Sequence, residues 1–595
     1  MADIGFNNVP SNQRIPGVYP EVEGDIPGQP RQWTLMVGQT VISQPAVPVK
    51  VSSVANAVRR FGAGSMLASM VERYLASDPN GTLWVLPLQD FGSTYSVGMT
   101  SGSAAITGLP PGLANGMTIS GAGITTGNTL ASYNSGAGTA NLTVGTFSGT
   151  TGAVSVNIKD APRATGVIDY THTPNEDGVI YLYIAGRLVT VPVTANQAAA
   201  DIATQTAAAI NGYLDANDLG FKRQQRNFRG VGMPVTASLD VAHATKVYLT
   251  ANNSGACGNT IDIQLNYYGT SGQQEIPDGL TVAITAMSGG SVDPLTNGLD
   301  ALLGDEQYDF IVQPYTTTTA LNDFQALMSD STGRWSPLRK VYGHVFTAAS
   351  FGANGSNAVT FGTARNDPHM TVVGYEASAP MPPYDVAAAY AGTFAASSRI
   401  DPARPTQTLA IADILAPHRH QRFSNATRQT LLGSGLALMD YDTDYTCKIL
   451  RAATTYQLDS NGTPDISYRD TETLYTLMAV VRQLTADWGA AFPRAKILDD
   501  DVAFGPGSSF NAGLPDQPIV TIKSGKAVLS ASYSRMATGK GQAVWLTDVG
   551  SFTSGLILQR NSSDPTRLDA LLPIVLASGL RVTAMKVDFA LQALS

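Results

Sequence analysis

Short apolar runs that alternate with helical segments constrain the fold of this chain more than any other feature. The runs 33–37 and 83–86 flank two stretches with helical spacing, 53–61 and 65–76. Runs of this kind are typical of buried strands in a sheet that is covered by helices. The same alternation of apolar runs and helical segments returns only after about residue 293. We therefore predict one α/β sheet built from two distant parts of the chain, with other domains inserted into it.

The second part of this predicted sheet begins with the run Tyr308–Val312. Further strands are predicted at Val341–Phe346 and Met370–Val373, and helices at Leu321–Met328 and Pro383–Ser397. Ser53 is suited to cap the first of the two early helices, which Gly62 and Gly64 end, and the second is expected at Ser65–Ala76.

Composition changes sharply between about Gly92 and Lys159, where Gly, Ser, Thr and Ala dominate and charge is almost absent. Short alternating strands separated by glycine turns indicate a small all-β sandwich in this segment. Residues 166–290 have a different, α+β pattern. It comprises a hairpin (Val179–Ile184 with Leu188–Val193), a helix at Asn196–Leu214, and strands at Val247–Thr250, Ile261–Leu265 and Thr281–Thr285.

An amphipathic helix is predicted at Asp470–Trp488, with Asp470 as its N-cap and Pro493 beyond its end. The apolar residues expected on one face are Leu474, Leu477, Met478, Val481 and Leu484. Its polar residues, such as Arg482, face away from that stripe. We expect the apolar face to be buried in a core.

Both ends of the chain have the pattern of extended arms. Five prolines within residues 1–30 exclude a helix there, yet Val18, Tyr19 and Val22 make this segment too apolar for a free tail. At the other end, one strand face carries Met585, Val587, Phe589 and Leu591. Leu580 and Val582 occupy even positions, whereas the other four occupy odd positions. The alternation of apolar residues therefore shifts by one residue near Ala584, and a bulge or a second strand partner is expected there.

Two interpretations of these arms stay open from the pattern alone. They close a sheet of their own subunit, or they add strands to a sheet of a neighbouring subunit. Some two dozen extended residues span roughly 80 Å, which is far enough to reach another subunit.

These observations predict a multidomain α/β and α+β protein with a discontinuous α/β core, inserted β-rich domains that include the small all-β sandwich, and extended terminal arms. The expected divisions are 1–30 (N-terminal arm), 31–91 (first part of the α/β domain), 92–165 (inserted all-β decoration domain), 166–290 (inserted α+β domain), 291–455 (second part of the α/β domain), 456–579 (C-terminal domain) and 580–595 (C-terminal arm strand).

Composition excludes several classes of function. Hydrophobic residues make up 43% of the chain and charged residues only 14%, which suits a surface that is buried against other copies. With a formal net charge of −9 and no basic run, no direct nucleic-acid partner is expected. Cys257 and Cys447, the two cysteines, are expected to be free thiols. We expect no signal peptide and no membrane insertion.

No catalytic constellation is evident, and we expect no catalytic residues, cofactor or metal. The phosphate-loop, zinc-protease and nucleophile-elbow patterns are missing from the sequence. His418 and His420 favour a surface loop over a metal site, and the run 499–501 favours a solvated acidic turn. Gly62-Ala-Gly64 favours a turn between helices over a nucleotide loop.

An ordered set of strings resembles the tail sheath proteins of Mu-like contractile-tailed phages. They include Arg31–Gln39, Phe61–Ala68, Ile261–Gly269, Thr281–Gly290, Tyr342–Thr347, Ile400–Pro405, Ala453–Gln457, Arg560–Pro565 and Leu571–Pro573. The strings follow one another in family order over nearly the whole chain except residues 92–165. The segment Lys526–Thr553 is less typical of the family.

The resemblance implies a structural virion protein and not an enzyme. Family members form hexameric rings stacked helically around an inner tail tube, with arms that add strands to neighbouring subunits. The baseplate triggers contraction, which drives the tube through the host envelope, and assembly takes place in the host cytoplasm. The implied partners are other copies of the chain, the tail tube protein, the baseplate and the tail terminator; the arm residues implied are Val18, Tyr19, Val22, Leu580, Val582, Met585, Val587, Phe589 and Leu591.

Two rival functions remain at this stage. One is another structural role in a tail, such as a tube or baseplate protein. The other is a glycan-degrading tail enzyme, which needs paired carboxylates in a cleft.

Overall fold

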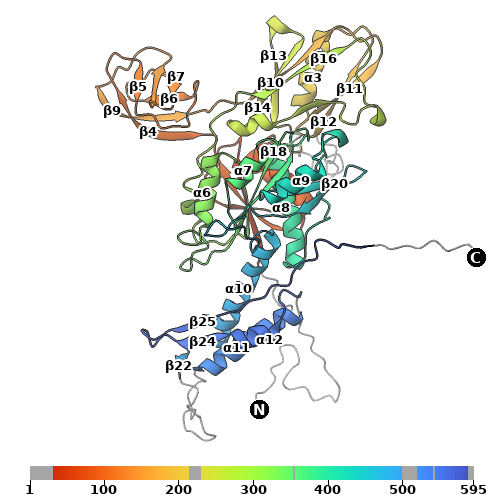
Figure 1. Ribbon diagram of the computed structural model, residues 1–595. Helices are drawn as coiled ribbons and strands as arrows, with labels where there is room; N and C mark the ends of the chain where they lie inside the picture. Colours follow the sequence, from red (N-terminus) through yellow and green to blue (C-terminus); the bar gives the residue numbers. More distant parts are fainter. Residues whose placement is uncertain (1–30, 214–229, 353–354, 499–518, 540–542, 587–595) are drawn as a thin grey trace, which may run out of the picture.

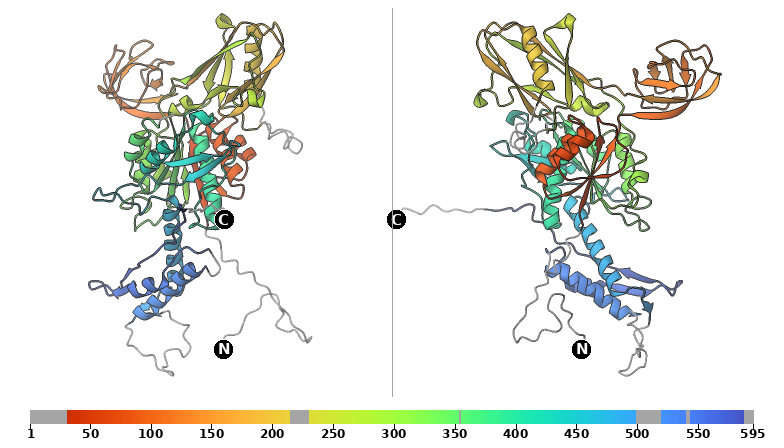
Figure 2. Two further views of the ribbon diagram at one scale, coloured as in Figure 1. Left: turned by 45° about the vertical axis from the view of Figure 1, so that its right-hand side comes forward. Right: turned by 180° about the vertical axis from the view of Figure 1, so that it is seen from behind.

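The computed structural model describes residues 31–213, 230–352, 355–498, 519–539 and 543–586. Figure 1 shows two inserted units at the top of the view, an α/β core in the middle and a smaller C-terminal unit below. The helix α10 (Thr471–Ala491) runs from the core into the C-terminal unit. Figure 2 shows the same arrangement from two other directions.

An eight-stranded sheet forms the centre of the core, in the order β2-β3-β1-β17-β18-β19-β20-β21. Its strands are β1 (Trp33–Gln39), β2 (Val49–Val51), β3 (Thr82–Leu88), β17 (Phe310–Val312), β18 (His344–Phe351), β19 (Met370–Glu376), β20 (Ala437–Tyr441) and β21 (Cys447–Arg451). Only the edge strands β2 and β21 run antiparallel to their neighbours. β1 pairs in parallel with β3 and with β17, so the predicted sheet built from two parts of the chain is confirmed.

Alternate residues of these strands face two separate cores. Met36 belongs to one buried cluster, whereas Leu35 and Val37 belong to the other. The first cluster is covered by α1 (Val54–Phe61), α2 (Met66–Ser77) and α8 (Pro383–Ile400). The second is covered by α5 (Leu299–Leu303), α6 (Thr318–Met328), α7 (Ala358–Thr363) and α9 (Asn425–Gly433). Since both faces are covered, the central strands are buried on both sides and are mostly apolar.

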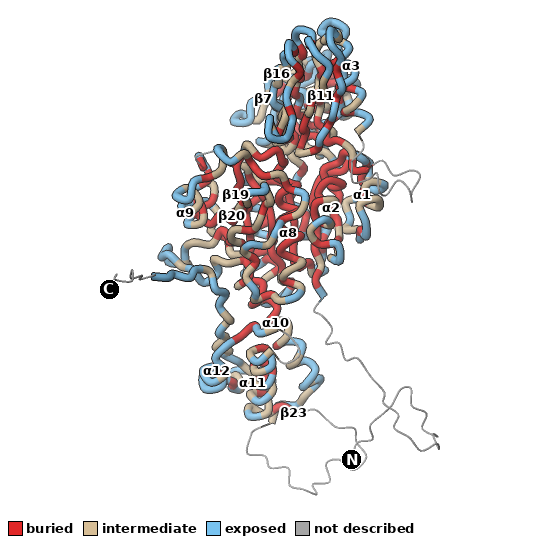
Figure 3. Tube along the Cα trace, turned by 90° about the vertical axis from the view of Figure 1, so that its right-hand side faces the viewer, coloured by how far each residue is buried: buried red, intermediate tan, exposed pale blue. Residues whose placement is uncertain are grey.

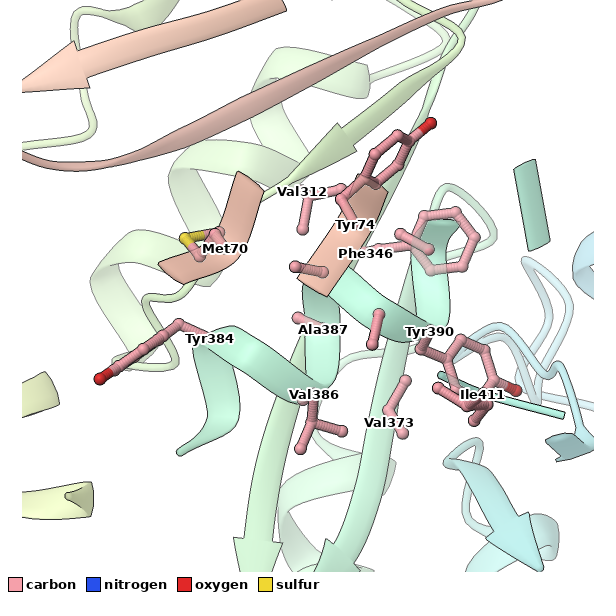
Figure 4. Close-up of a cluster of buried hydrophobic side chains, with 14 of the residues drawn as sticks. Met70, Tyr74, Val312, Phe346, Val373, Tyr384, Val386, Ala387, Tyr390 and Ile411 are labelled. Atoms are coloured by element: carbon pink, nitrogen blue, oxygen red, sulfur yellow. The ribbon is translucent and has the colours of Figure 1, made fainter. Parts of the chain in front are cut away.

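Helix α8 is buried over most of its length (Figure 3) because alanine and glycine let neighbouring elements approach it closely. A Cβ atom at Gly392 would lie 2.8 Å from the carbonyl oxygen of Tyr74 in α2, which only glycine tolerates. Figure 4 shows Met70 and Tyr74 of α2 beside Ala387 of α8 and Phe346 of the sheet. The predicted cap at Ser53 is confirmed, since its side chain accepts from the backbone N–H of Asn56, whereas Ser65, predicted inside the second helix, is the N-cap of α2 and accepts from the backbone N–H of Ala68.

Several strand boundaries differ from the prediction, and two of them show why. The run Val341–Phe346 becomes a strand only at His344. The run Ile261–Leu265 is a strand only from Ile263 (β15, Ile263–Leu265), because the preceding residues 256–260 form a 3₁₀ helix, η2 (Ala256–Thr260). The apolar pattern marks burial in both places but does not fix where ladder pairing begins.

The low-charge segment folds as one six-stranded sheet, in the order β6-β9-β4-β5-β8-β7. Its strands are β4 (Gly92–Met99), β5 (Ala105–Thr107), β6 (Thr118–Gly121), β7 (Leu130–Asn134), β8 (Thr139–Leu142) and β9 (Gly152–Lys159). The outer strands also meet: Thr118 bridges Thr129, and the amide of Leu130 donates to Met117 O at 2.9 Å. The segment is all-β as predicted, but the two-layer sandwich is not confirmed, because the sheet curls until its edges join into a small barrel.

The second insertion holds two sheets with α3 (Ala199–Asn211) packed between them. The four-stranded sheet, in the order β13-β14-β10-β16, contains β10 (Thr165–Thr171), β13 (Val235–Leu239), β14 (Lys246–Ala251) and β16 (Thr281–Ser288). The three-stranded sheet has the order β12-β11-β15. The predicted hairpin is confirmed as β11 (Gly178–Ile184) with β12 (Arg187–Val193), joined by Ala185 and Gly186, both with positive φ. Short 3₁₀ turns η1 (Val241–His243) and η3 (Thr270–Gly272) complete the unit.

A buried ionic cluster joins this insertion to the core. Arg187, at the start of β12, pairs with Glu72 of α2 and donates to Ser69 Oγ at 3.1 Å. Ser69 Oγ in turn donates to Asp385 of α8 at 2.7 Å. The Arg187 side chain is 2% exposed, so its charge depends on these acidic partners for stabilisation.

Replacing residues 91–160 by a Gly-Ser-Gly linker should leave the core folded. Gly92 and Lys159 are direct partners in the β4–β9 pair, so the chain enters and leaves the barrel at one place. The Asp90–Arg163 ion pair, at 2.9 Å, closes the base below them. We expect a soluble protein whose circular dichroism loses only β signal and whose main thermal transition is retained. Aggregation of the shortened chain would contradict an autonomous barrel.

Replacing Arg187 by Ala should destabilise the docking of the second insertion by about 3–5 kcal/mol, because Glu72 and Asp385 lose a buried cationic partner. Differential scanning calorimetry should show an earlier transition for residues 166–290. The matched control is Lys246→Ala, whose side chain is 36% exposed in an ion pair with Asp169 inside the insertion and should shift the transition far less. Equal shifts in both variants would contradict the proposed role of the buried cluster.

Candidate functional site

The candidate site is the C-terminal unit and its attachment to the core through α10. The first turns of α10 are buried in the core, where Tyr475 and Met478 belong to its first cluster. Its later turns face the C-terminal unit, where Leu484 is buried. The predicted single stripe is therefore only partly right: Leu474, Met478 and Leu484 are buried, whereas Leu477 and Val481 are half-buried. A helix that crosses between two cores changes its buried face along its length.

Asp470 occupies the N-cap position of α10 as predicted, but its side chain does not cap the helix. Its carboxylate instead accepts two hydrogen bonds from Arg451 of β21, at 2.7 and 2.9 Å. Arg482 pairs with Asp309, which precedes β17 in the chain. Both polar residues therefore fix α10 to the sheet.

A chain of buried polar groups also joins α10 to the sheet. Thr471 Oγ1 lies 2.8 Å from Thr371 Oγ1, which lies 2.8 Å from His344 Nε2. Burial, with a smaller contribution from His369, holds the pKa of His344 well below its usual range. His344 is therefore neutral in the folded protein at neutral pH.

The C-terminal unit packs α10 against α11 (Ile522–Thr538), α12 (Val549–Gly555) and a hairpin of β24 (Ile557–Arg560) with β25 (Leu568–Leu571). A second, two-stranded pair joins β22 (Lys496–Ile497) to β23 (Ile519–Val520). Tyr533 of α11 stacks on Phe552 of α12, with ring centroids 3.8 Å apart. A two-stranded hairpin is marginal by itself, so this helical packing must support it.

An open apolar groove of about 430 Å³ runs between the helices and the two strand pairs. Its lining residues come from α10, α11, β22, β23 and the hairpin: they include Trp488, Phe492, Ile497, Val520, Leu529, Leu558, Leu568 and Ala570. Within the described part of the chain, β25 is paired only with β24. The unit thus presents an unpaired strand edge beside an apolar groove, which is the combination that accepts an added strand.

The C-terminal segment extends away from the body of the molecule (Figures 1 and 2). Among the predicted arm residues, Leu580 is 73% exposed and Val582 and Met585 are each 82% exposed. No strand is assigned between 577 and 586. The other predicted arm residues, Val18, Tyr19, Val22, Val587, Phe589 and Leu591, lie outside the described residues. The structure therefore does not bring the two arms together within the part that it describes.

Sequence inspection missed the residues that hold the root of this segment. Arg581 Nη2 donates to Glu472 Oε2 of α10 at 3.0 Å, and Arg581 Nη1 donates to Gln407 Oε1 at 3.3 Å. The available signal was a single arginine inside an otherwise apolar C-terminal stretch.

No described residue suggests catalysis. His418 and His420 stack at 5.9 Å near the short turn η4 (Arg419–Gln421), and the described residues contain no cluster of three or more metal-ligating side chains. Gly62 and Gly64 form the predicted turn between helices, both with positive φ. Cys257 and Cys447 are free. The run 499–501 lies outside the described residues. No helix in the described ranges has the length and apolarity needed to cross a bilayer.

Comparison with known families defines the class of protein. Residues 290–455, which span β17 to β21 of the core sheet, match the family model of the phage tail sheath protein central domain. The chain is therefore similar to structural proteins of the contractile phage tail sheath, as the sequence strings indicated.

Within that class, the chain is 29% identical over 595 residues to the Mu-like prophage FluMu tail sheath protein of Haemophilus influenzae, covering 99% of this chain and all of the relative. Two solved sheath tail proteins also align. One, from Desulfitobacterium hafniense, has 11% identity, a TM-score of 0.40 and coverage of 94% and 100% of the two chains. The other, from Listeria innocua, has 10% identity, a TM-score of 0.40 and coverage of 92% of each chain.

The neutral state of His344 predicts that stability falls in acid. The unfolded chain protonates this histidine near pH 6.5, whereas the folded protein does not, so the unfolded state binds more protons below that pH. The loss reaches up to about 1.4 kcal/mol per pH unit below 6.5. His344→Gln should flatten the fall in melting temperature between pH 7.5 and 5.5. The exposed control His172→Asn should not, and a slope unchanged by His344→Gln would contradict this role.

Proposed function

We propose that this chain polymerises around a tail tube as stacked hexameric rings, held together by strands that its arms donate to neighbouring subunits, and contracts to drive the tube through a host envelope. The observation that carries the proposal is the pairing of an exposed apolar C-terminal segment with an open apolar groove beside an unpaired strand edge. The exposed apolar segment and the open groove with its unpaired strand edge are each unfavourable in a monomer. A strand bound in the groove would bury the apolar surface of both and pair the edge.

The chemistry of the donor and acceptor is complementary. Residues 585–591 alternate, with apolar residues at every second position, so one face of the strand can enter a groove. The groove offers Trp488, Ile497 and Leu558 to that face. The unpaired edge of β25 offers backbone donors and acceptors for the ladder.

Energetics favour a lattice over an isolated contact. Burial of four apolar side chains contributes roughly 6–12 kcal/mol gross. Ordering the strand costs roughly 1–2 kcal/mol for each residue, which offsets most of that gain. Repetition around rings and along the tube makes the association cooperative, and head-to-tail contacts whose rotation does not close give helical polymers.

Contraction requires two packings of the same subunits, of which the more stable one is kinetically withheld. Rigid cores that are connected by extended arms can rotate and slide while the arms stay attached. The proposed partners are therefore other copies of this chain, the tail tube, the baseplate that triggers contraction and the tail terminator, all within the virion.

Removing Met585–Ser595 should give folded monomers that do not polymerise. The deleted residues lie beyond the helices and strands of the C-terminal unit, so the melting temperature should be unchanged. Light scattering and negative-stain electron microscopy should show no long polymers, whereas the full chain should give wide sheath-like tubes. Normal polymers from the truncated chain would rule out strand donation by this arm.

A charge in the groove should have the same effect without shortening the chain. Ala570 is exposed, lines the groove and is the cross-strand partner of Leu558. Ala570→Asp places a carboxylate where the apolar face of the arm would be buried, so polymerisation should fall at least tenfold. The control is Ser562→Asp, exposed in the hairpin loop, which should polymerise normally.

A further inference from the structure

The root of the N-terminal arm is held by buried polar contacts. Gln32 directly precedes β1 and is 9% exposed. Its Nε2 donates to Ser398 Oγ of α8 at 3.1 Å and to Tyr475 OH of α10 at 3.0 Å. Its Oε1 accepts from Arg399 Nε at 3.1 Å. The side chain of Gln32 therefore bridges the end of α8 and the start of α10.

The root of the C-terminal arm is held at the same place. Arg581 contacts Glu472 at 3.0 Å, and its guanidinium lies 3.6 Å from Asp470. Gln407 Nε2 donates to the carbonyl oxygen of Leu580 at 3.1 Å, so the backbone is fixed as well. Gly579 packs so closely that a Cβ atom there would lie 2.3 Å from Pro405 Cγ.

These two sets of contacts converge on the first turns of α10. Glu472 and Tyr475 are three residues apart on that helix. Glu472 is buried, with its side chain 5% exposed, and also accepts from the amide and the hydroxyl of Thr406 at 2.9 and 2.6 Å. Thr406 and Gln407, which follow α8 in the chain, thus contact Glu472 and Arg581 and belong to the same group of contacts.

Arg581 is the half-buried residue of an otherwise exposed stretch. Its side chain is 17% exposed, whereas Leu580 is 73% and Val582 and Met585 are each 82% exposed. Arg581 therefore holds this exposed stretch to the start of α10.

We propose that the first turns of α10 and the end of α8 form a shared anchor for both arms, with Gln32 and Arg581 as its positioning residues. This inference rests on the proposed strand donation and adds to it the place where each arm pivots. The anchor presents both arms in a fixed direction before assembly, so the residues at each root need not be ordered when a neighbour binds. It also makes α10 the element that links the movement of one arm to that of the other.

The first test uses the full chain with Arg581→Ala. The arm strand is intact, but its root loses its anchor, and we expect the critical concentration for polymerisation to rise at least tenfold. The variant should also lower the melting temperature of the monomer, since buried Glu472 loses its cationic partner, so assembly is measured well below that transition. Arg581→Lys keeps one cationic contact to Glu472 and should restore most of the assembly. Arg567→Ala, at an exposed ion pair in the hairpin, is the control and should assemble normally.

The second test concerns the sharing of the anchor. Tyr475→Phe removes one hydroxyl and leaves the contacts of Gln32 with α8 in place. We expect this variant to raise the critical concentration at least threefold. If both arms depend on the same turns of α10, the double variant Tyr475→Phe/Arg581→Ala should raise it by less than the product of the two single effects.

The outcomes separate this inference from the function on which it rests. If removal of Met585–Ser595 abolishes assembly while Arg581→Ala assembles at an unchanged concentration, the anchor is wrong and strand donation stands. If Arg581→Lys fails to restore assembly, charge-based anchoring is wrong. A double variant whose effect equals the product would overturn the shared anchor and leave two independent roots.

Discussion

The parallel pairing of β1 with both β3 and β17 is the constraint on which the rest of the structure depends. Thr34 pairs with Leu83 on one side and with Phe310 on the other. Strand β1 is thus central, and its residues Leu35, Met36 and Val37 can be fully buried only when the distant segment arrives. Everything between β3 and β17 must therefore leave the core and return to it.

The entropic cost of closing a loop rises only slowly with the length of the loop, so large insertions are tolerated between β3 and β17. Asp90 marks where the excursion begins, and it collects partners from all sides: Gln39 of β1 at 2.8 Å, Arg163 at 2.9 Å and the amide of Ser254 at 3.1 Å. The Asp90 carboxylate, just after β3, thereby fixes both the place where the chain leaves the core for the barrel and the place where the second insertion contacts the core. The core, once closed, is a rigid body whose attachments all have defined positions.

Features that depend on residues close in the sequence could be predicted, whereas features that depend on distant residues could not. Local signals predicted the cap at Ser53 and the apolar strands of the core sheet. Non-local pairing was not visible: the bridge between Thr118 and Thr129 that turns a predicted sandwich into a barrel leaves no periodic trace. The same holds for Gln32 and Arg581, because an isolated polar residue has no pattern until the fold supplies its partners. The interpretation of Asp470 as a cap failed for this reason, since Arg451 competes for its carboxylate.

A rigid core, a helix that leaves it and two arms that begin at the start of that helix form a mechanically simple subunit. Because α10 packs Tyr475 and Met478 into the core and Ala479, Val480 and Leu484 into the C-terminal unit, movement of one body relative to the other requires bending or repacking of α10. Such repacking has discrete alternatives, as interdigitated side chains do not deform continuously. In the proposed assembly, arms that extend beyond Arg581 keep neighbouring subunits connected whichever packing is adopted. A lattice built in the proposed way changes its geometry in one cooperative step while its strand connections are preserved.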